Sequence, residues 1–273
     1  MTLKEKLIDC RKNKKALLAA NFYNFETLNA VVQAAKITGS EIILQASEST
    51  LNYLGIETAA KMAKSALKEN GVTGWLHFDH GATVLLVQKC LDAGFDSVMI
   101  DASEASFSDN VKTTQKVVKL AAAYRANVEA ELGYVAKLGQ DQNMPMFTQP
   151  NEAKFFTDET GINALAVAIG NAHGFYKSAP HIQFDLLQKI SDVVSIPIVL
   201  HGSSGIPEVD LQRAIKLGIC KINLATEIKN TFMKKLKSVL LENEDIDLRN
   251  VFPKATEEAT NLIVNKLNHI NQV

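Results

Sequence analysis

Short apolar runs alternate with longer amphipathic segments along almost the whole chain. Runs that are apolar at successive positions are typical of strands buried on both faces of a parallel sheet. They predict strands at residues 16–22, 41–46, 74–78, 97–101, 127–132, 164–169, 197–200 and 221–224. Segments with apolar residues every three or four positions predict helices at 26–38, 56–69, 83–93, 110–125, 183–193, 208–217, 226–241 and 256–269.

This alternation predicts an α/β fold with a parallel sheet covered by helices. Eight strands in 273 residues favour a (β/α)8 barrel, or TIM barrel, formed by a single domain over residues 1–273 and followed by C-terminal helices. A doubly wound open sheet is the alternative that the pattern leaves open. The connection at about 133–149 is long for a compact domain, which predicts a mobile loop beside a binding site.

Composition narrows the range of partners. With 47% hydrophobic residues the chain can bury a full core, and a net charge of −1 argues against a nucleic-acid-binding surface. No long apolar run follows the early lysines, so we expect neither a signal peptide nor a membrane partner. Three widely spaced cysteines suit reduced thiols rather than disulfides. These observations predict a cytoplasmic protein.

Three predicted strands each end in a histidine beside a glycine. These histidines are His80, His173 and His201. In a barrel the carboxyl ends of all strands share one rim, so the three imidazoles are expected to converge. Three neutral imidazoles with an open fourth position are typical of a catalytic zinc site. For any one of these histidines taken alone, a structural role is the commoner explanation.

Acidic residues occupy equivalent positions at the strand ends. Asp79 precedes His80, Asp101 ends the fourth strand, and Glu131 lies near the end of the fifth. Asp101 and Glu131 are expected either to orient the histidines or to hold a second cation. Helix capping or pairing with an arginine is the structural alternative. His77, two residues before Asp79, is expected to lie behind the metal ligands.

Small residues follow the seventh and eighth strands. Gly202, Ser203, Ser204 and Gly205 precede one predicted helix, and residues 223–226 open another. Barrels commonly bind phosphate at these two loops, where backbone N–H groups at helix N-termini attract anions. The sequence therefore predicts a phosphate site next to the metal site, so that one small molecule would be held at both ends.

The motifs together resemble the zinc-dependent class II ketose-bisphosphate aldolases, which include fructose- and tagatose-bisphosphate aldolases. The similarity spans nearly the whole chain and rests on His-x-Asp-His-Gly at 77–81, Ser-Val-Met-Ile-Asp at 97–101, Val-Glu-Ala-Glu-Leu-Gly at 128–133, Gly-Asn-Ala-His-Gly at 170–174, His-Gly-x-Ser-Gly at 201–205 and Asn-x-Ala-Thr-Glu at 223–227. The resemblance implies reversible cleavage of a ketose phosphate to dihydroxyacetone phosphate and an aldehyde, which is glyceraldehyde 3-phosphate for a 1,6-bisphosphate.

The resemblance also implies residue roles. Zn²⁺ would bind His80, His173 and His201, with Asp101 and Glu131 as auxiliary metal-binding acids. Asp79 would be the catalytic proton donor and acceptor. The dihydroxyacetone-phosphate half of the sugar phosphate would contact Ser47, Gly174, Lys177, Gly202, Ser204, Asn223, Ala225 and Thr226. Asn21 and Asn24 resemble the asparagines of the family's first strand. A homodimer or homotetramer is implied by the resemblance alone.

The chain departs from the family pattern in two places. The loop after Gly133 lacks the usual Gly-Gly and acidic sequence, which leaves Asp141 as the candidate loop base, and Ala102 and Glu104 replace common family residues. A substrate that is another phosphorylated ketose or a keto-sugar acid therefore stays open, as does a sugar-phosphate-binding subunit without turnover. A Schiff-base aldolase is disfavoured because the sixth strand carries no lysine. A metal-dependent barrel hydrolase, in which zinc activates water, is a further alternative. Such a hydrolase would need no phosphate-binding loops, so a phosphate bound beside the metal would count against it.

Overall fold

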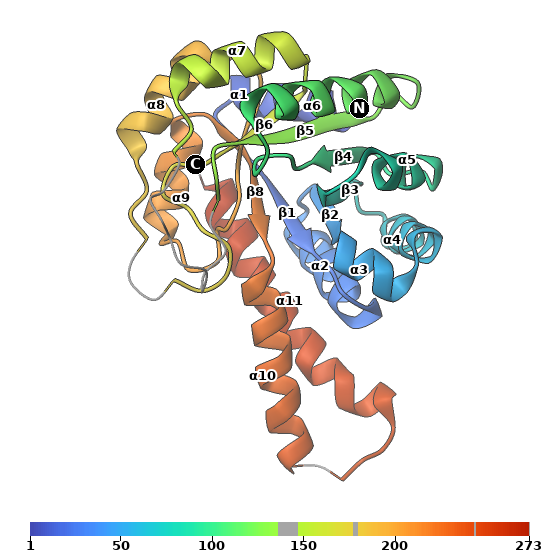
Figure 1. Cartoon of the computed structure of the whole chain (residues 1–273). Coiled ribbons are helices and arrows are strands. Elements are labelled where there is room, and N and C mark those ends of the chain that lie inside the picture. Colours follow the sequence, from blue (N-terminus) through green and yellow to red (C-terminus); the bar gives the residue numbers. More distant parts are fainter. Residues whose placement is uncertain (136–146, 177–179, 243, 273) are drawn as a thin grey trace.

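Eight parallel strands close into a barrel in which each strand pairs with its neighbours in the sequence and β8 pairs with β1 (Figure 1). The computed structural model describes residues 1–135, 147–176, 180–242 and 244–272. The strands are β1 (Leu17–Asn21), β2 (Ile42–Ser47), β3 (Gly74–Gly81), β4 (Ser97–Ile100), β5 (Asn127–Leu132), β6 (Ala164–Val167), β7 (Ile198–Leu200) and β8 (Ile219–Leu224). The predicted (β/α)8 barrel is confirmed, and the open-sheet alternative is excluded.

Helices surround this barrel. They are α1 (Leu3–Lys12), α2 (Phe25–Thr38), α3 (Glu48–Leu54), α4 (Ile56–Asn70), α5 (Val84–Asp92), α6 (Phe107–Ala122), α7 (Pro150–Thr160), α8 (Phe184–Val193), α9 (Glu208–Lys216), α10 (Thr226–Glu242) and α11 (Leu248–Asn271). The strand and helix boundaries differ from the prediction by a few residues at most ends. Three helices, α1, α3 and α7, were not predicted, because each is short or mostly polar. The last helix was predicted to begin at residue 256, but α11 begins at Leu248.

The interior of the barrel is filled by strand side chains and closed at one end by α1. Leu3 and Leu7 of this helix are buried in the same apolar cluster as Ile43, Trp75 and Val199. A capping box between Thr2 and Glu5 starts the helix. Because α1 covers the amino ends of the strands, the opposite rim is the one left for a site.

The connection between β5 and α7 has well-defined ends. Thr148 is buried and accepts a hydrogen bond from the Ala168 N–H at 2.8 Å, while its hydroxyl donates to the Leu132 carbonyl. Residues 136–146, which include Asp141, lie outside the described residues, and so does the predicted mobility of that part of the loop. In the described part of the chain, none of the helices combines the length and apolar character needed to cross a membrane.

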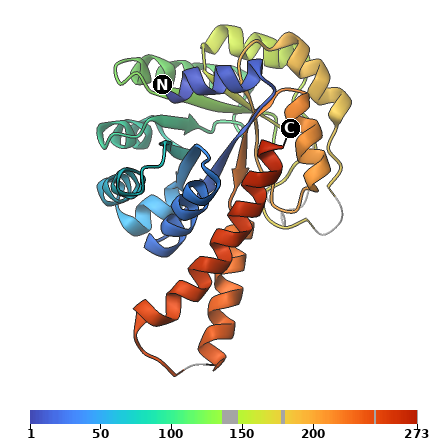
Figure 2. The same cartoon turned by 180° about the vertical axis from the view of Figure 1, so that it is seen from behind.

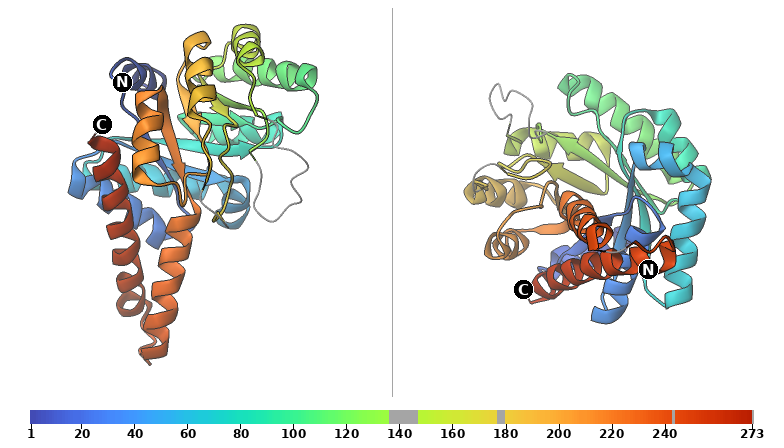
Figure 3. Two further views of the ribbon diagram at one scale, coloured as in Figure 1. Left: turned by 90° about the vertical axis from the view of Figure 1, so that its left-hand side faces the viewer. Right: turned by 90° about the horizontal axis from the view of Figure 1, so that it is seen from below.

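The two C-terminal helices form a hairpin that extends beyond the barrel. Figures 2 and 3 show α10 and α11 side by side, with the turn between them far from the strands. The second half of α11 returns to the barrel, where Ile263 and Leu267 join the core. Arg249 lies near the tip of this hairpin and pairs with Asp247 at 2.7 Å. Arg249 therefore does not contribute to the rim of the barrel in its own chain.

Candidate active site

The carboxyl end of β3 is distorted where it delivers Asp79 and His80. Pairing with β4 shifts register between Phe78 and Gly81, and His80 has a φ of 53°. This left-handed conformation is uncommon outside glycine and is often found at functional sites. A Cβ atom on Gly81 would lie 2.6 Å from the Met99 carbonyl oxygen, so only glycine fits there. The distortion brings the ring of His80 against those of His173 and His201.

The three predicted histidines form one cluster. Ring centroids are 4.9 Å apart for His80 and His173, 4.7 Å for His80 and His201, and 5.7 Å for His173 and His201. One nitrogen from each lies within 4.8 Å of the others. The Nδ1 atoms of His173 and His201 are buried without a hydrogen-bond partner, and such atoms are costly unless a ligand satisfies them. The residues therefore fit a metal ion bound by three imidazoles.

The imidazoles differ in protonation. Burial and the neighbouring charge of His80 lower the pKa of His173 to about 4, and the same two causes lower the pKa of His201. Burial also opposes the cationic form of His80, but Asp79 and Asp101 outweigh it and raise the pKa of His80 to about 9. Two of the three rings are therefore neutral at pH 7, which is the form that binds metals.

Asp101 and Glu131 lie on either side of this cluster. Asp101 accepts a hydrogen bond from His80 Nδ1 at 2.8 Å, which leaves Nε2 of that ring facing the other histidines. Glu131 lies 3.4 Å from His201 Nδ1, and burial together with Asp101 raises its pKa to about 8. His80, Asp101 and Glu131 also form a second group with metal-ligand spacing. Both predicted roles, orientation and cation binding, are compatible with this geometry.

Asp79 is buried between two asparagines. Asn21 and Asn223 donate hydrogen bonds to its two carboxylate oxygens at 3.2 and 3.3 Å, and Oδ1 lies 3.9 Å from His80 Nε2. Burial opposes ionisation, but the histidines around it, Lys221 and the Asn21 amide together lower its pKa. The result is a fixed, ionised carboxylate beside the metal-type cluster. His77 instead hydrogen-bonds Ser97 and lies below the rim.

The loop after β7 is shaped by backbone contacts. Gly202 has a φ of 62°, and a Cβ atom there would meet the Ala172 carbonyl oxygen at 2.2 Å. Ser204 accepts a hydrogen bond from the Glu227 N–H at 3.2 Å, while Gly205 donates to the Glu227 carboxylate at 2.6 Å. Lys266 of α11 lies 3.1 Å from that carboxylate and balances its charge. These contacts fix the loop at the start of α10, where free N–H groups favour an anion.

One cavity of about 60 Å³ joins the two constellations. It is lined by Asn21, Asp79, His80, His173, Gly174, Gly202, Ser204, Asn223, Ala225 and Thr226. Most of the predicted site residues therefore meet at one place. His201 is fully buried beneath them. Ser47 ends β2 opposite Asp79 but does not line the cavity, and Lys177 lies outside the described residues.

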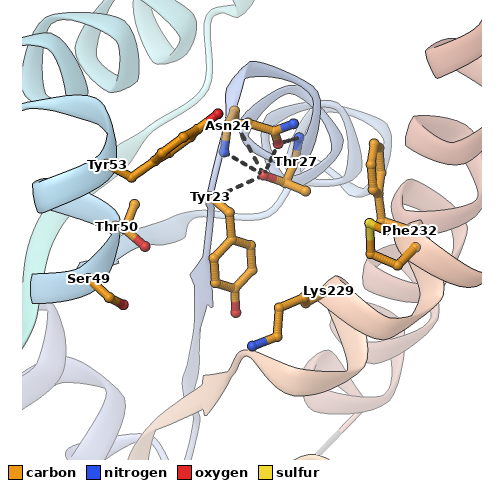
Figure 4. A pocket seen from close by; sticks show the side chains of 9 residues that line it. Tyr23, Asn24, Thr27, Ser49, Thr50, Tyr53, Lys229 and Phe232 are labelled. Carbon is orange, nitrogen blue, oxygen red and sulfur yellow. Dashed lines mark hydrogen bonds between the residues drawn. The ribbon is translucent and has the colours of Figure 1, made fainter. Parts of the chain in front are cut away.

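Another, larger cavity has a volume of about 320 Å³ (Figure 4). Tyr23 lines it and donates a hydrogen bond to the carbonyl of Ala225, which lines the smaller cavity. Lys229 of α10 faces Tyr23, with its Nζ 5.4 Å from the ring centroid, and α3 contributes Tyr53. Sequence reasoning missed Tyr23 and Lys229. The position of Lys229, three residues after Thr226 on the same helix, was the available signal.

Two further charged residues were missed in the barrel interior. Glu129 and Lys221 are fully buried and face each other from β5 and β8. Glu129 belongs to the quoted Val-Glu-Ala-Glu-Leu-Gly motif, but its partner stands alone in an apolar strand. The only sequence signal for Lys221 was that a charged residue interrupts an otherwise apolar strand.

A barrel rim that combines a three-histidine metal-type site, a buried carboxylate and a loop of small residues at a helix N-terminus is typical of a metal-dependent enzyme. Comparison with known proteins specifies the class. The family model for class-II fructose-bisphosphate aldolase matches residues 1–273. The chain belongs to this family. It is a metal-dependent aldolase, a carbon–carbon lyase that reversibly cleaves a ketose bisphosphate into dihydroxyacetone phosphate and an aldehyde.

Similar proteins agree with this assignment. The chain is 36% identical over 271 residues to the D-tagatose-1,6-bisphosphate aldolase subunit GatY of Klebsiella oxytoca, covering 98% of this chain and 95% of GatY. The YdjI aldolase of Escherichia coli K12 has 30% identity and a TM-score of 0.87 over 98% of this chain and 96% of its own. A putative fructose-1,6-biphosphate aldolase of Coccidioides immitis has 25% identity and a TM-score of 0.90 over the same shares.

Proposed function

We propose that the metal is Zn²⁺ and that His80 Nε2, His173 Nδ1 and His201 Nδ1 hold it. The observation that carries this proposal is the pair of buried Nδ1 atoms without partners, next to a ring whose Nδ1 is already bonded to Asp101. Nitrogen ligands in this number leave a coordination position for substrate. When bound, zinc would supply Lewis-acid polarisation of the ketone and stabilise the negative charge that develops there.

Asp79 is proposed as the acid and base for the aldehyde-derived oxygen. In the cleavage direction its carboxylate would take the proton of the hydroxyl next to the breaking bond, and it would return that proton in synthesis. Asn21 and Asn223 donate to both of its oxygens and would keep the carboxylate pointing into the cavity. Proton removal from the dihydroxyacetone-phosphate carbon is assigned to a base on the loop at 133–149, with Asp141 as the candidate.

The phosphate of the dihydroxyacetone half is proposed to bind the loops after β7 and β8. Ser204 and Thr226 line the cavity and adjoin the N-terminus of α10. Gly174, Gly202, Asn223 and Ala225 line the same cavity. Ser47 and Lys177 remain proposed contacts. Because Gly202 admits no side chain, the backbone can approach the phosphate closely there.

The far end of the ketose is proposed to lie in the larger cavity beside Tyr23 and Lys229. Within the described residues no salt bridge to a carboxylate is found for Lys229, whose Nζ lies over the ring of Tyr23, so its charge is proposed to meet a second phosphate. Arg249 is 89% exposed at the hairpin tip and pairs with Asp247. Together with the similarity to GatY, this favours tagatose- or fructose-1,6-bisphosphate, which would release glyceraldehyde 3-phosphate.

Three further features remain proposals. Asp101 and Glu131 are proposed to hold a second cation in addition to orienting the histidines. A homodimer or homotetramer is expected from the family. A cytoplasmic location agrees with three buried, unpaired cysteines.

A substrate panel tests this function. We expect the chain with Zn²⁺ to cleave tagatose- and fructose-1,6-bisphosphate faster than ketose monophosphates or keto-sugar acids, and borohydride with substrate should not inactivate it. Substrate-dependent inactivation by borohydride would instead show a lysine Schiff base. Tight binding of a dihydroxyacetone-phosphate mimic without any cleavage would favour a binding subunit that needs a partner, as the word subunit in the name of GatY suggests.

A further inference from the structure

A buried ion pair crosses the barrel interior below the proposed metal site. Lys221 Nζ on β8 lies 2.9 and 3.2 Å from the two carboxylate oxygens of Glu129 on β5. Both side chains are 1% exposed or less. Buried charges are costly even when paired, and apolar residues of similar size often give equal or greater stability. A contribution to stability therefore does not explain this pair by itself.

The pair is connected to one of the three imidazoles. Glu129 Oε1 lies 2.8 Å from His201 Nε2. A carboxylate only accepts hydrogen bonds, so the Nε2 atom must donate. The proton of neutral His201 is then on Nε2, and the lone pair is on Nδ1, which has no hydrogen-bond partner. This is the tautomer that binds a metal through Nδ1.

The surroundings of Glu129 leave it no other role than acceptor. Lys221 is a donor without acceptor capacity, and His77 Nε2 lies 3.9 Å from the second oxygen. The three groups around the carboxylate are thus an ammonium and two imidazoles. Neither Glu129 nor Lys221 lines the cavities at the rim. Glu129 therefore acts on the reaction through His201, while the charge of Lys221 also helps to keep Asp79 ionised.

We propose that Glu129 and Lys221 are positioning residues that fix the tautomer of His201. Glu129 orients the ring and keeps its proton on Nε2, and Lys221 holds the carboxylate in place as an acceptor. The proposal rests on the metal site proposed above for its consequence, but the tautomer itself is a property of the metal-free protein.

Replacing Glu129 by Gln gives a specific expectation. A glutamine amide has one acceptor oxygen and one donor nitrogen, and Lys221 can only attract the oxygen. The amide NH2 group then faces His201 Nε2, which must become the acceptor and pass its proton to Nδ1. We expect E129Q to bind Zn²⁺ roughly 10- to 100-fold more weakly than the wild type, which is the usual effect of losing such a partner.

A second substitution should reverse the defect. In the double variant K221M/E129Q no lysine attracts the amide oxygen, so the amide can turn and accept from His201 Nε2. Zinc affinity should recover to within a fewfold of the wild type, although two charged groups have been removed. A role in stability alone predicts no such recovery, because zinc affinity would then follow the melting temperature of each variant.

The experiment has two readouts besides activity. Zinc affinity is measured by competition with a chromophoric chelator, and the tautomer is measured by ¹⁵N NMR of histidine-labelled, metal-free protein. The His201 signal is identified by its absence in His201→Asn. Lys6→Met is the control, because it breaks a lysine–glutamate pair with Glu41 that touches no histidine, and it should leave zinc affinity and tautomer unchanged.

The outcomes separate the two proposals. A proton on Nε2 of His201 in the wild type, moved to Nδ1 by E129Q and returned in the double variant, supports the tautomer assignment whether or not zinc binds. A wild-type protein that has this tautomer but binds no zinc contradicts the proposed function alone. A proton on Nδ1 in the wild type, or a folded E129Q with wild-type tautomer and zinc affinity, would overturn the inference. The wild-type measurement requires only one variant to fold, His201→Asn, which assigns the signal.

Discussion

The two halves of the barrel rim, which are proposed to bind opposite charges, are built from different parts of the chain. On the side of β3 to β7, buried side chains hold one another through specific hydrogen bonds, such as His80 with Asp101 and His201 with Glu129. On the side of β7 and β8, backbone groups and small residues such as Gly202 and Ser204 form the site. The first half depends on the protonation of single atoms. The second depends on space and on the neutralisation of the Glu227 carboxylate by Lys266.

The largest effect should follow from removing a ligand in the first half. His173→Ala is expected to lose zinc and to lower kcat by about 10³-fold or more, because Lewis-acid stabilisation contributes several kcal/mol. The barrel should remain folded, since His173 lies at the cavity. Metal analysis, circular dichroism and turnover check this. His201→Ala should also lower the melting temperature, because His201 is fully buried.

Asp79→Asn tests the chemistry between the two halves. Cleavage should fall by about 10²- to 10⁴-fold, the usual contribution of a general acid or base. Exchange of a dihydroxyacetone-phosphate C–H proton with solvent should persist, because a loop base carries that step. Zinc occupancy must be measured in the same samples, since Asp79 adjoins His80. With zinc in place, loss of exchange would mean that Asp79 serves both proton transfers.

Ser204→Asp tests the second half without touching the first. A carboxylate next to a bound phosphate costs several kcal/mol in a partly buried site, so KM should rise by about 100-fold or more. Zinc content should stay at the wild-type level. Ser204→Ala is the matched control and should change KM far less, because it removes a hydroxyl group without adding charge. An unchanged KM in the aspartate variant would place the phosphate elsewhere.

The smallest effect is expected at the larger cavity. Lys229→Met should raise KM for a ketose bisphosphate by about fivefold, since an exposed charge pair contributes roughly 1 kcal/mol. The KM of a ketose monophosphate that lacks the distal phosphate should not change. Lys234→Met, on the same helix but outside the cavity, is the control. Equal effects of both variants on both substrates would remove Lys229 from substrate binding.

The difference between the side-chain half and the backbone half of the rim also explains how much of the site could be predicted. His80, His173 and His201 each follow an apolar run and precede a glycine, and a closed barrel brings all strand ends together. The barrel and the metal-type cluster were therefore predicted correctly. The phosphate loop stays a prediction, based on its position after β7 and on its small residues, since backbone N–H groups leave little trace in a sequence.

The residues and helices that the sequence did not reveal owe their positions to packing between distant segments. Lys221 looks like an interruption of an apolar strand, and only the closed barrel places it against Glu129. Helix α1 is mostly polar, so its role in closing the barrel depends on a few buried side chains such as Leu3 and Leu7. Sequence alone likewise gives no sign that α10 and α11 extend away from the rim, as they do in Figure 3.

The central claim is that three particular nitrogen atoms hold one zinc ion. Anomalous diffraction at the zinc edge from crystals of the zinc-loaded enzyme tests it most directly. The account predicts a peak roughly 2.0–2.1 Å from His80 Nε2, His173 Nδ1 and His201 Nδ1, the usual zinc–nitrogen distance. A peak at other residues, or a zinc ion bound through Nε2 of His201, would contradict it.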